Sequence, residues 1–144
     1  MKLRRAVLSD AGVLAIIEQT QPQAAGWGKS GFESELKLAC SFILCAEQET
    51  QLVGFVAARF SVDSAEIENL AVLRGWERRG IGKQLLAEAL LELKEQGVEQ
   101  ISLEVAKDNS AACALYQKAG FIKLGERKDF YGPGHAAWLL GKKL

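Results

Sequence analysis

The spacing of apolar residues changes several times along the chain, and each spacing predicts a different kind of element. Between residues 81 and 93 they recur at helical intervals, and Gly97 ends the run, so this segment predicts a helix. A second helical stripe covers residues 112–119 and ends at Gly120. Both helices therefore have an apolar face that must pack against another layer.

Two further helices are predicted nearer the start of the chain. Ser9 and Asp10 can cap a helix that continues to Ile17, because short polar side chains favour the first helical turn. Residues 30–33 have the sequence of a capping box and predict the start of a second helix. The segment between them, residues 21–28, is interrupted by proline and glycine and predicts irregular structure.

Shorter apolar or alternating runs predict strands. The seven runs cover residues 3–7, 41–46, 52–60, 65–73, 101–105, 121–127 and 136–140. Strands and helices alternate in the middle of the chain, whereas hairpins are expected at both ends. This order is typical of a mixed sheet flanked by helices.

The segment Arg78-Arg79-Gly80-Ile81-Gly82-Lys83 joins a predicted strand to the clearest predicted helix. Glycine lets the backbone approach a ligand closely, and the first N–H groups of a helix attract anions. The segment therefore favours a pyrophosphate site, and with it a nucleotide-bearing cofactor. The alternative is a tight strand-to-helix turn with solvated basic side chains, since the motif is neither a complete dinucleotide fingerprint nor a P-loop.

Composition limits the remaining function classes. The chain has 144 residues and a formal net charge of zero, which predicts one domain over residues 1–144 and argues against nucleic-acid or membrane partners. No apolar run is long enough to span a membrane, and the first residues lack the apolar core of a signal peptide. The three cysteines form no C-x-x-C pair, so we expect reduced thiols and a cytoplasmic protein.

The sequence has few residues that could form a metal site or a histidine-based nucleophilic centre. His135 is the only histidine, and we predict no metal and a structural role for this side chain. Any one of the cysteines could instead be a catalytic nucleophile, but cysteine usually packs as a small apolar residue.

A second motif follows the phosphate-loop candidate. It consists of Asn109, Ala112, Leu115-Tyr116 and Gly120-Phe121. Together with the segment from Arg78 to Gly82 and the following Leu85-Leu86, it resembles the GNAT superfamily of N-acetyltransferases. The resemblance covers residues 70–121. It implies an α/β (α+β) fold with a central, mostly antiparallel sheet of about seven strands and about four helices, and acetyl-CoA as cosubstrate.

A narrower resemblance is to ribosomal-protein alanine N-acetyltransferases. It rests on Trp27 with Phe32 and Glu35, on Leu103-Glu104-Val105, on Asn109 with Tyr116, and on the segment from Arg127 to Tyr131. It implies that the cosubstrate contacts the backbone of Leu70, Ala71 and Val72, the phosphate-binding residues Arg78, Arg79, Gly80, Ile81, Gly82 and Lys83, and Asn109 near the pantetheine. It also implies that Glu104 is the general base and Tyr116 the general acid. Glu77 departs from the family pattern, because a carboxylate beside a pyrophosphate is unfavourable unless it points away.

Each of these residues also has a simpler structural interpretation. A carboxylate in an interior strand loses hydration and becomes a stronger base, but Glu104 could instead reach water. Tyr116 lies on an apolar helical stripe where it could only pack, and Asn109 could only cap the helix. Glu66 and Glu68 are alternative bases on the neighbouring strand. Trp27, Glu68, Phe130 and Tyr131 are the candidates for the acceptor groove, with ordinary packing as the alternative for the aromatic residues.

The chemistry favours one acceptor class. An α-amino group has a pKa of about 8 and needs little help to lose its proton, whereas a lysine side chain, at about 10.4, needs much more. We therefore expect a protein or peptide N-terminus as acceptor, with a small amine or a lysine side chain as the alternative. A non-catalytic acyl-CoA-binding module is a further alternative. The expected assembly is a monomer or a homodimer.

Overall fold

The computed structural model describes all residues 1–144 and contains one sheet of seven strands in the order β1-β2-β3-β4-β5-β7-β6. The strands are β1 (Lys2–Arg5), β2 (Ser41–Gln48), β3 (Gln51–Phe60), β4 (Ser64–Val72), β5 (Gln100–Ala106), β6 (Ile122–Arg127) and β7 (Ala137–Lys143). Every neighbouring pair is antiparallel except β4 and β5. The predicted mixed, mostly antiparallel sheet of about seven strands is confirmed.

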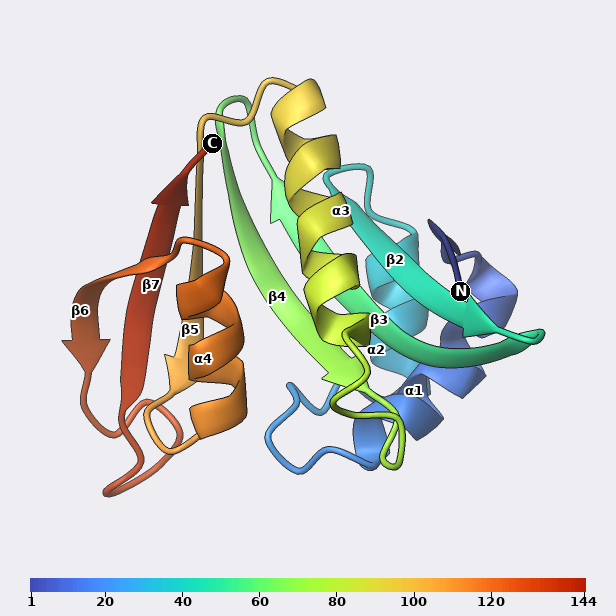
Figure 1. Cartoon of the computed structure of the whole chain (residues 1–144), viewed down its shortest axis with the longest axis horizontal. Helices are drawn as coiled ribbons and strands as arrows, with labels where there is room; N and C mark the ends of the chain where they lie inside the picture. The colour runs from blue at the N-terminus through green and yellow to red at the C-terminus, as the bar shows by residue number, and fades with distance from the viewer.

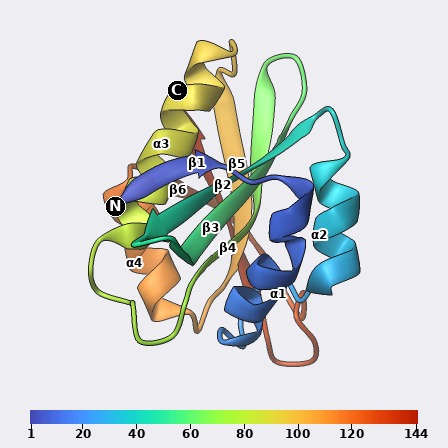
Figure 2. The same cartoon turned by 90° about the vertical axis from the view of Figure 1, so that its right-hand side faces the viewer.

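Four α-helices and one short 3-10 helix cover the two faces of the sheet. They are η1 (Leu8–Asp10), α1 (Ala11–Gln19), α2 (Gly28–Leu36), α3 (Ile81–Glu95) and α4 (Ser110–Lys118). Figure 2 shows α1 and α2 on one side of the sheet and α3 and α4 on the other. The stripe on α3, with Leu85 and Leu93, packs into the larger core, and Leu14 of α1 packs with Phe32 and Phe55 in a smaller core. Each helix pair thus buries its apolar face against one side of the sheet.

Strands β4 and β5 separate partway along their length, as Figure 1 shows. They are paired at only three positions, the last of which joins Glu66 to Ser102. Beyond this pair, one edge of β4 has no strand partner. Leu70, Ala71 and Val72, which end β4 just before the phosphate-loop candidate, therefore lie on the separated part of the strand.

A β-bulge lies in β4 where the two strands begin to separate. Ala57 pairs with Asn69 and Ala58 with Ile67, so Glu68 is the extra residue. Ile67 packs into the larger core, whereas Asn69 faces α1 and donates to the Glu18 carboxylate at 2.8 Å. The bulge therefore changes which side chains β4 presents just before the phosphate-loop candidate.

Two predicted helix caps are wrong. The helix α2 begins at Gly28, before the expected capping box at residues 30–33, and Glu18 of α1 accepts hydrogen bonds from the N–H groups of Trp27 and Gly28 at 2.8 and 3.0 Å. Asp10 does not cap α1; its carboxylate accepts from the Val7 N–H at 2.7 Å and binds Arg4. In the first case a carboxylate of the preceding helix replaced the local cap; in the second, Asp10 stands at the N-cap position of α1, but its side chain binds the nearby Val7 and Arg4. None of the helices is long and apolar enough to cross a membrane.

Candidate active site

The segment between β4 and α3 has the geometry of an anion site. Arg78 and Gly80 both adopt left-handed backbone conformations, with φ of 63° and 78°. The amide N–H groups of residues 80–83 have no acceptor within the protein, because they form the last loop residue and the first turn of the 15-residue helix α3. Successive free amides at the positive end of a helix bind phosphate oxygens well.

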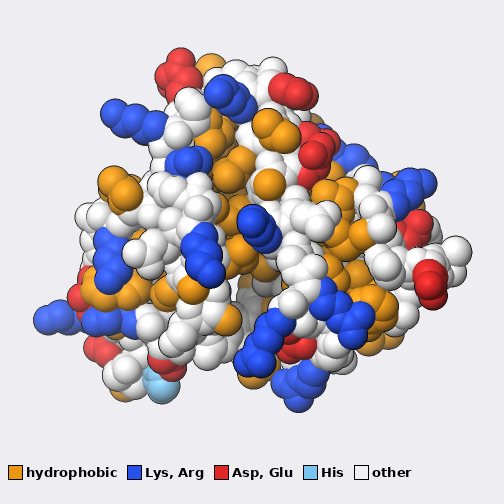
Figure 3. Space-filling view, in the orientation of Figure 1, with side chains coloured by type: hydrophobic (Ala, Val, Ile, Leu, Met, Phe, Trp, Pro, Cys, Tyr) orange, Lys and Arg blue, Asp and Glu red, His pale blue; other side chains and the backbone are white.

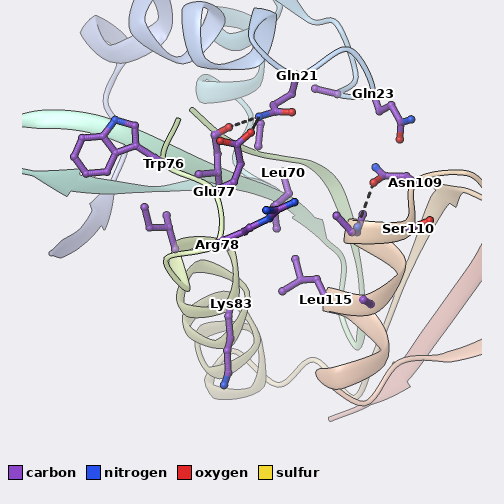
Figure 4. Close-up of a pocket in the computed structure, with 18 of the residues that line it drawn as sticks. Gln21, Gln23, Leu70, Trp76, Glu77, Arg78, Lys83, Asn109, Ser110 and Leu115 are labelled. Atoms are coloured by element: carbon purple, nitrogen blue, oxygen red, sulfur yellow. Dashed lines mark hydrogen bonds between the residues drawn. The ribbon is translucent and has the colours of Figure 1, made fainter. Parts of the chain in front are cut away.

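A cavity of about 840 Å³ opens at this segment, between α3 and α4 (Figure 4). Nine of the ten residues predicted to bind the cosubstrate line it: Leu70, Ala71, Val72, Arg78, Gly80, Ile81, Gly82, Lys83 and Asn109. Figure 3 shows basic side chains on both sides of the hollow between α3 and α4. The cavity therefore combines free amides, positive charge and an apolar wall, which suits a phosphate-bearing ligand with an apolar arm.

Arg79 is the predicted residue that does not line this cavity. Its guanidinium lies 4.5 Å from the ring centroid of Trp76 and donates to the Gly75 carbonyl at 3.5 Å. Arg79 therefore contributes to this site through its backbone, which forms part of the turn. A phosphate contact from this side chain stays a prediction.

The position of Asn109 is compatible with both interpretations that the sequence left open, a helix cap and a contact with the cosubstrate. Its side-chain oxygen accepts a hydrogen bond from the Ala112 N–H at 3.2 Å and so caps α4. The same residue lines the cavity, and its bond to Ala112 is drawn in Figure 4. The cap orients the side chain beside the space that an acyl-CoA arm would use.

One wall of the cavity was missed by the sequence analysis. It consists of Gln21, Pro22, Gln23 and Ala24, in the irregular segment between α1 and α2. The Gln21 amide donates to the Val72 carbonyl at 2.7 Å and to the Glu77 carboxylate at 3.3 Å. These contacts join residues about fifty positions apart, so no local pattern could have indicated them.

The same contacts explain how Glu77 is tolerated beside a phosphate site. Its carboxylate accepts from the Gly75 N–H at 2.6 Å and faces Gln21 (Figure 4). Hydrogen bonds from its own N–H, from Gly75 and from Gln21 lower the pKa of Glu77. Its negative charge is thus held by neighbouring donors at the edge of the cavity.

Tyr116 of α4 is buried, with 6% of its surface exposed, and its ring packs edge to face against Phe121 at 5.6 Å. Burial, together with the nearby Tyr131 hydroxyl and Cys113 thiol, raises the pKa of Tyr116 well above its usual value. The hydroxyl is therefore protonated at neutral pH and is a weaker acid than that of an exposed tyrosine. Tyr116 lines neither large cavity, so its role as general acid stays a prediction.

Glu104 lies on the opposite face of β5 from the core. Leu103 and Val105 on either side of it pack beneath α3 and α4, so the strand alternation directs Glu104 away from these helices. The Arg127 guanidinium lies 3.1 Å from Oε1 of Glu104, whereas Oε2 is buried without a hydrogen-bond partner. The Tyr131 hydroxyl donates to the Glu104 carbonyl at 3.5 Å.

A second cavity, of about 690 Å³, lies on this face. It is lined by residues that include Glu66, Ser102, Glu104, Leu124, Arg127 and Leu139, from four strands. It shares Glu66 and Ser102 with a smaller neighbouring cavity that contains Glu68. Burial and the adjacent Glu66 carboxylate raise the pKa of Glu68 to about 7. The face therefore brings the three carboxylates together with the basic side chains of Arg127, Lys142 and Lys143, so that its charge is mixed.

The predicted aromatic residues of the acceptor groove are divided between two places. Phe130 and Tyr131 contact each other edge to face at 4.9 Å in the β6–β7 loop, and Arg127 lies 5.5 Å from the Phe130 ring. Trp27 packs on Phe32 at 5.3 Å in the α1–α2 layer and lines neither large cavity. The structure therefore groups Phe130 and Tyr131 with Glu104 but not Trp27.

Comparison with known proteins identifies what this arrangement is similar to. A family model described as Acetyltransferase (GNAT) family matches residues 13–121. A ribosomal protein bS18-alanine N-acetyltransferase of Haemophilus influenzae is 38% identical over 84 residues, which are 58% of this chain and 57% of that relative. The match thus spans little more than half the length of this relative.

Solved structures extend the similarity to nearly the whole chain. The ribosomal-protein-alanine N-acetyltransferase of Escherichia coli superposes with a TM-score of 0.88 and 26% identity, covering 99% of this chain and 92% of that one. An acetyltransferase of Bacillus anthracis in complex with acetyl coenzyme A has a TM-score of 0.71 and 26% identity, covering 78% and 68%.

Proposed function

The chain belongs to the acetyltransferase (GNAT) family, and from this premise we propose that it transfers the acetyl group of acetyl-CoA to the α-amino group of a protein N-terminus. The family membership confirms the resemblance seen in the sequence. One observation carries the choice of reaction. A cavity with free amides lies at the separated end of β4, and a second cavity that contains Glu104 lies on the other face of β5; the acetyl group would pass between these strands to reach Glu104.

The cosubstrate side is suited to acetyl-CoA. The amides of residues 80–83 and the side chains of Arg78 and Lys83 would hold the pyrophosphate. Leu70, Val72 and Asn109 line the path toward the gap, where the pantetheine arm would lie. Acetyl-CoA supplies an activated thioester. Everything else in the reaction is positioning and proton transfer by this chain.

Glu104 and Tyr116 would move the two protons. Glu104 would accept a proton from the acceptor ammonium group, so that the neutral amine can attack the thioester carbonyl. Tyr116 would donate its proton to the departing sulfur from the α4 side, a step that its raised pKa opposes. Tyr131 contacts the Glu104 backbone.

An α-amino group suits this site better than a lysine side chain. Its pKa of about 8 means that a single carboxylate base suffices, whereas lysine, at about 10.4, requires more assistance. Glu66, Glu68 and Glu104 on this face each offer a carboxylate that can pair with an ammonium group. The relatives named for alanine N-acetylation of a ribosomal protein support the same acceptor class.

Mass spectrometry on matched peptides tests the proposal. One peptide begins with a free Ala and has its internal lysines replaced by arginine; its partner has a blocked N-terminus and free lysines. With acetyl-CoA and the full chain, we expect acetylation of the first peptide alone. Acetylation of the second would instead show a lysine acetyltransferase. Acetyl-CoA binding without modification of either peptide would redirect the proposal to small amines or to a non-catalytic role.

A further inference from the structure

The two carboxylate oxygens of Glu104 have different surroundings. Oε1 lies 3.1 Å from the Arg127 guanidinium, whereas Oε2 is buried and accepts no hydrogen bond. A buried carboxylate oxygen without a donor is unfavourable, so its surroundings must hold it in place. Arg127 is the only cationic side chain that forms an ion pair with Glu104.

The position of Arg127 at the end of β6 makes it suitable to pair with Glu104. It pairs with Ala137 of β7, and β7 in turn pairs with β5 through Leu139 opposite Glu104. The guanidinium also lies 5.5 Å from the Phe130 ring. Its backbone is therefore fixed by the sheet, and its planar head is held between an aromatic ring and Oε1.

We propose that Arg127 is a positioning residue for acetyl transfer: by pairing with Oε1 of Glu104, it holds the carboxylate in one orientation at the acceptor cavity. The inference rests on the proposed function, because it gives Glu104 the role of base. Arg127 contacts neither the acceptor nor the thioester in this arrangement. It acts only through Glu104.

Other charged and titratable groups also surround Glu104. Glu66 of β4 lines the same cavity, Lys142 and Lys143 of β7 line it as well, and the Tyr131 hydroxyl contacts the Glu104 carbonyl. Without Arg127, Glu104 would lose its paired cation, and its carboxylate would no longer be held in one orientation.

The experiment measures kcat, with a saturating Ala-start peptide, and the KM for acetyl-CoA. Arg127→Gln should lower kcat by about tenfold and leave the KM for acetyl-CoA unchanged, because Arg127 pairs with Glu104 and does not line the cosubstrate cavity. Arg127→Lys retains the charge and should restore most of kcat. Lys128→Gln removes the neighbouring exposed charge and should change neither quantity.

A double-mutant cycle with Glu104→Gln decides whether Arg127 acts through Glu104. In the Glu104→Gln background, Arg127→Gln should have no further effect on kcat. Additive losses, or an unchanged kcat in Arg127→Gln, would overturn the inference and leave a surface ion pair. If Glu104→Gln retained full activity, the base assignment would fail and this inference with it. If the wild type acetylated no peptide, the proposed function itself would fail.

Discussion

The two halves of the site are made from different parts of the chain. On the cosubstrate side, residues 80–83, at the start of α3, provide backbone amides whose directions follow from the helix itself. On the acceptor side, carboxylates come from β4 and β5, a guanidinium from β6 and a phenol from the β6–β7 loop. Backbone amides tolerate many side chains, whereas the acceptor face depends on individual side-chain atoms. Substitutions should therefore have unequal effects in the two halves.

The largest expected effect is on the acceptor side, at Glu104. Glu104→Gln keeps the size of the side chain but removes the base, so kcat should fall by about 10²- to 10⁴-fold, the usual contribution of general acid–base catalysis. Acetyl-CoA affinity, measured by calorimetry, should stay near the wild-type value because the cosubstrate cavity is on the other face.

Two results would contradict this division. Unchanged kinetics in Glu104→Gln would transfer the role to Glu68, whose raised pKa makes it the next candidate base. A large loss of acetyl-CoA affinity would mean that the two halves are not separable.

Tyr116→Phe should have the next largest effect, up to about 100-fold on kcat, because a thiolate leaves with less assistance than an amine or alkoxide would. The ring contact with Phe121 is retained, and the hydroxyl is not part of a hydrogen bond in the fold. The melting temperature should therefore change little. A fully active variant would show that Tyr116 only packs.

A glycine pair tests the cosubstrate side with a matched control. Gly80 and Gly97 flank the two ends of α3, both have positive φ, and neither has an atom close to the position of an added Cβ. Alanine at either position should destabilise the fold by about 1–2 kcal/mol through backbone strain. Only Gly80→Ala should also weaken acetyl-CoA binding, because only Gly80 belongs to the free-amide turn. Equal affinities for the two variants would remove this turn from the binding site.

The smallest effect is expected in the α1–α2 segment. Glu18 accepts three hydrogen bonds, from Trp27, Gly28 and Asn69, and so holds the segment that forms one wall of the cosubstrate cavity. Glu35 is an equally buried carboxylate that binds Arg59 instead. Both Glu18→Gln and Glu35→Gln should lower stability, but only the former should raise the KM for acetyl-CoA. A similar rise in both would make the effect a general consequence of destabilisation.

The same contrast explains what sequence could and could not predict. The segment from Arg78 to Lys83 was recognisable because its contacts are local: glycines, a helix start and basic residues are adjacent in the chain. Strand alternation likewise predicted the sheet. The wall at Gln21 and the pair of Arg127 with Glu104 depend on residues that only the sheet order brings together. The Glu18 cap replaced a local capping box for the same reason, since a buried carboxylate from another helix was available.

A structure with a bisubstrate analogue, in which CoA is joined covalently to the α-amino group of an Ala-start peptide, tests the two-faced site most directly. We predict that the pyrophosphate lies on the amides of residues 80–83, that the linker passes between β4 and β5, and that the peptide nitrogen lies within hydrogen-bond reach of the Glu104 carboxylate. A peptide placed away from the Glu104 face, with the CoA still bound at α3, would contradict the proposed acceptor site.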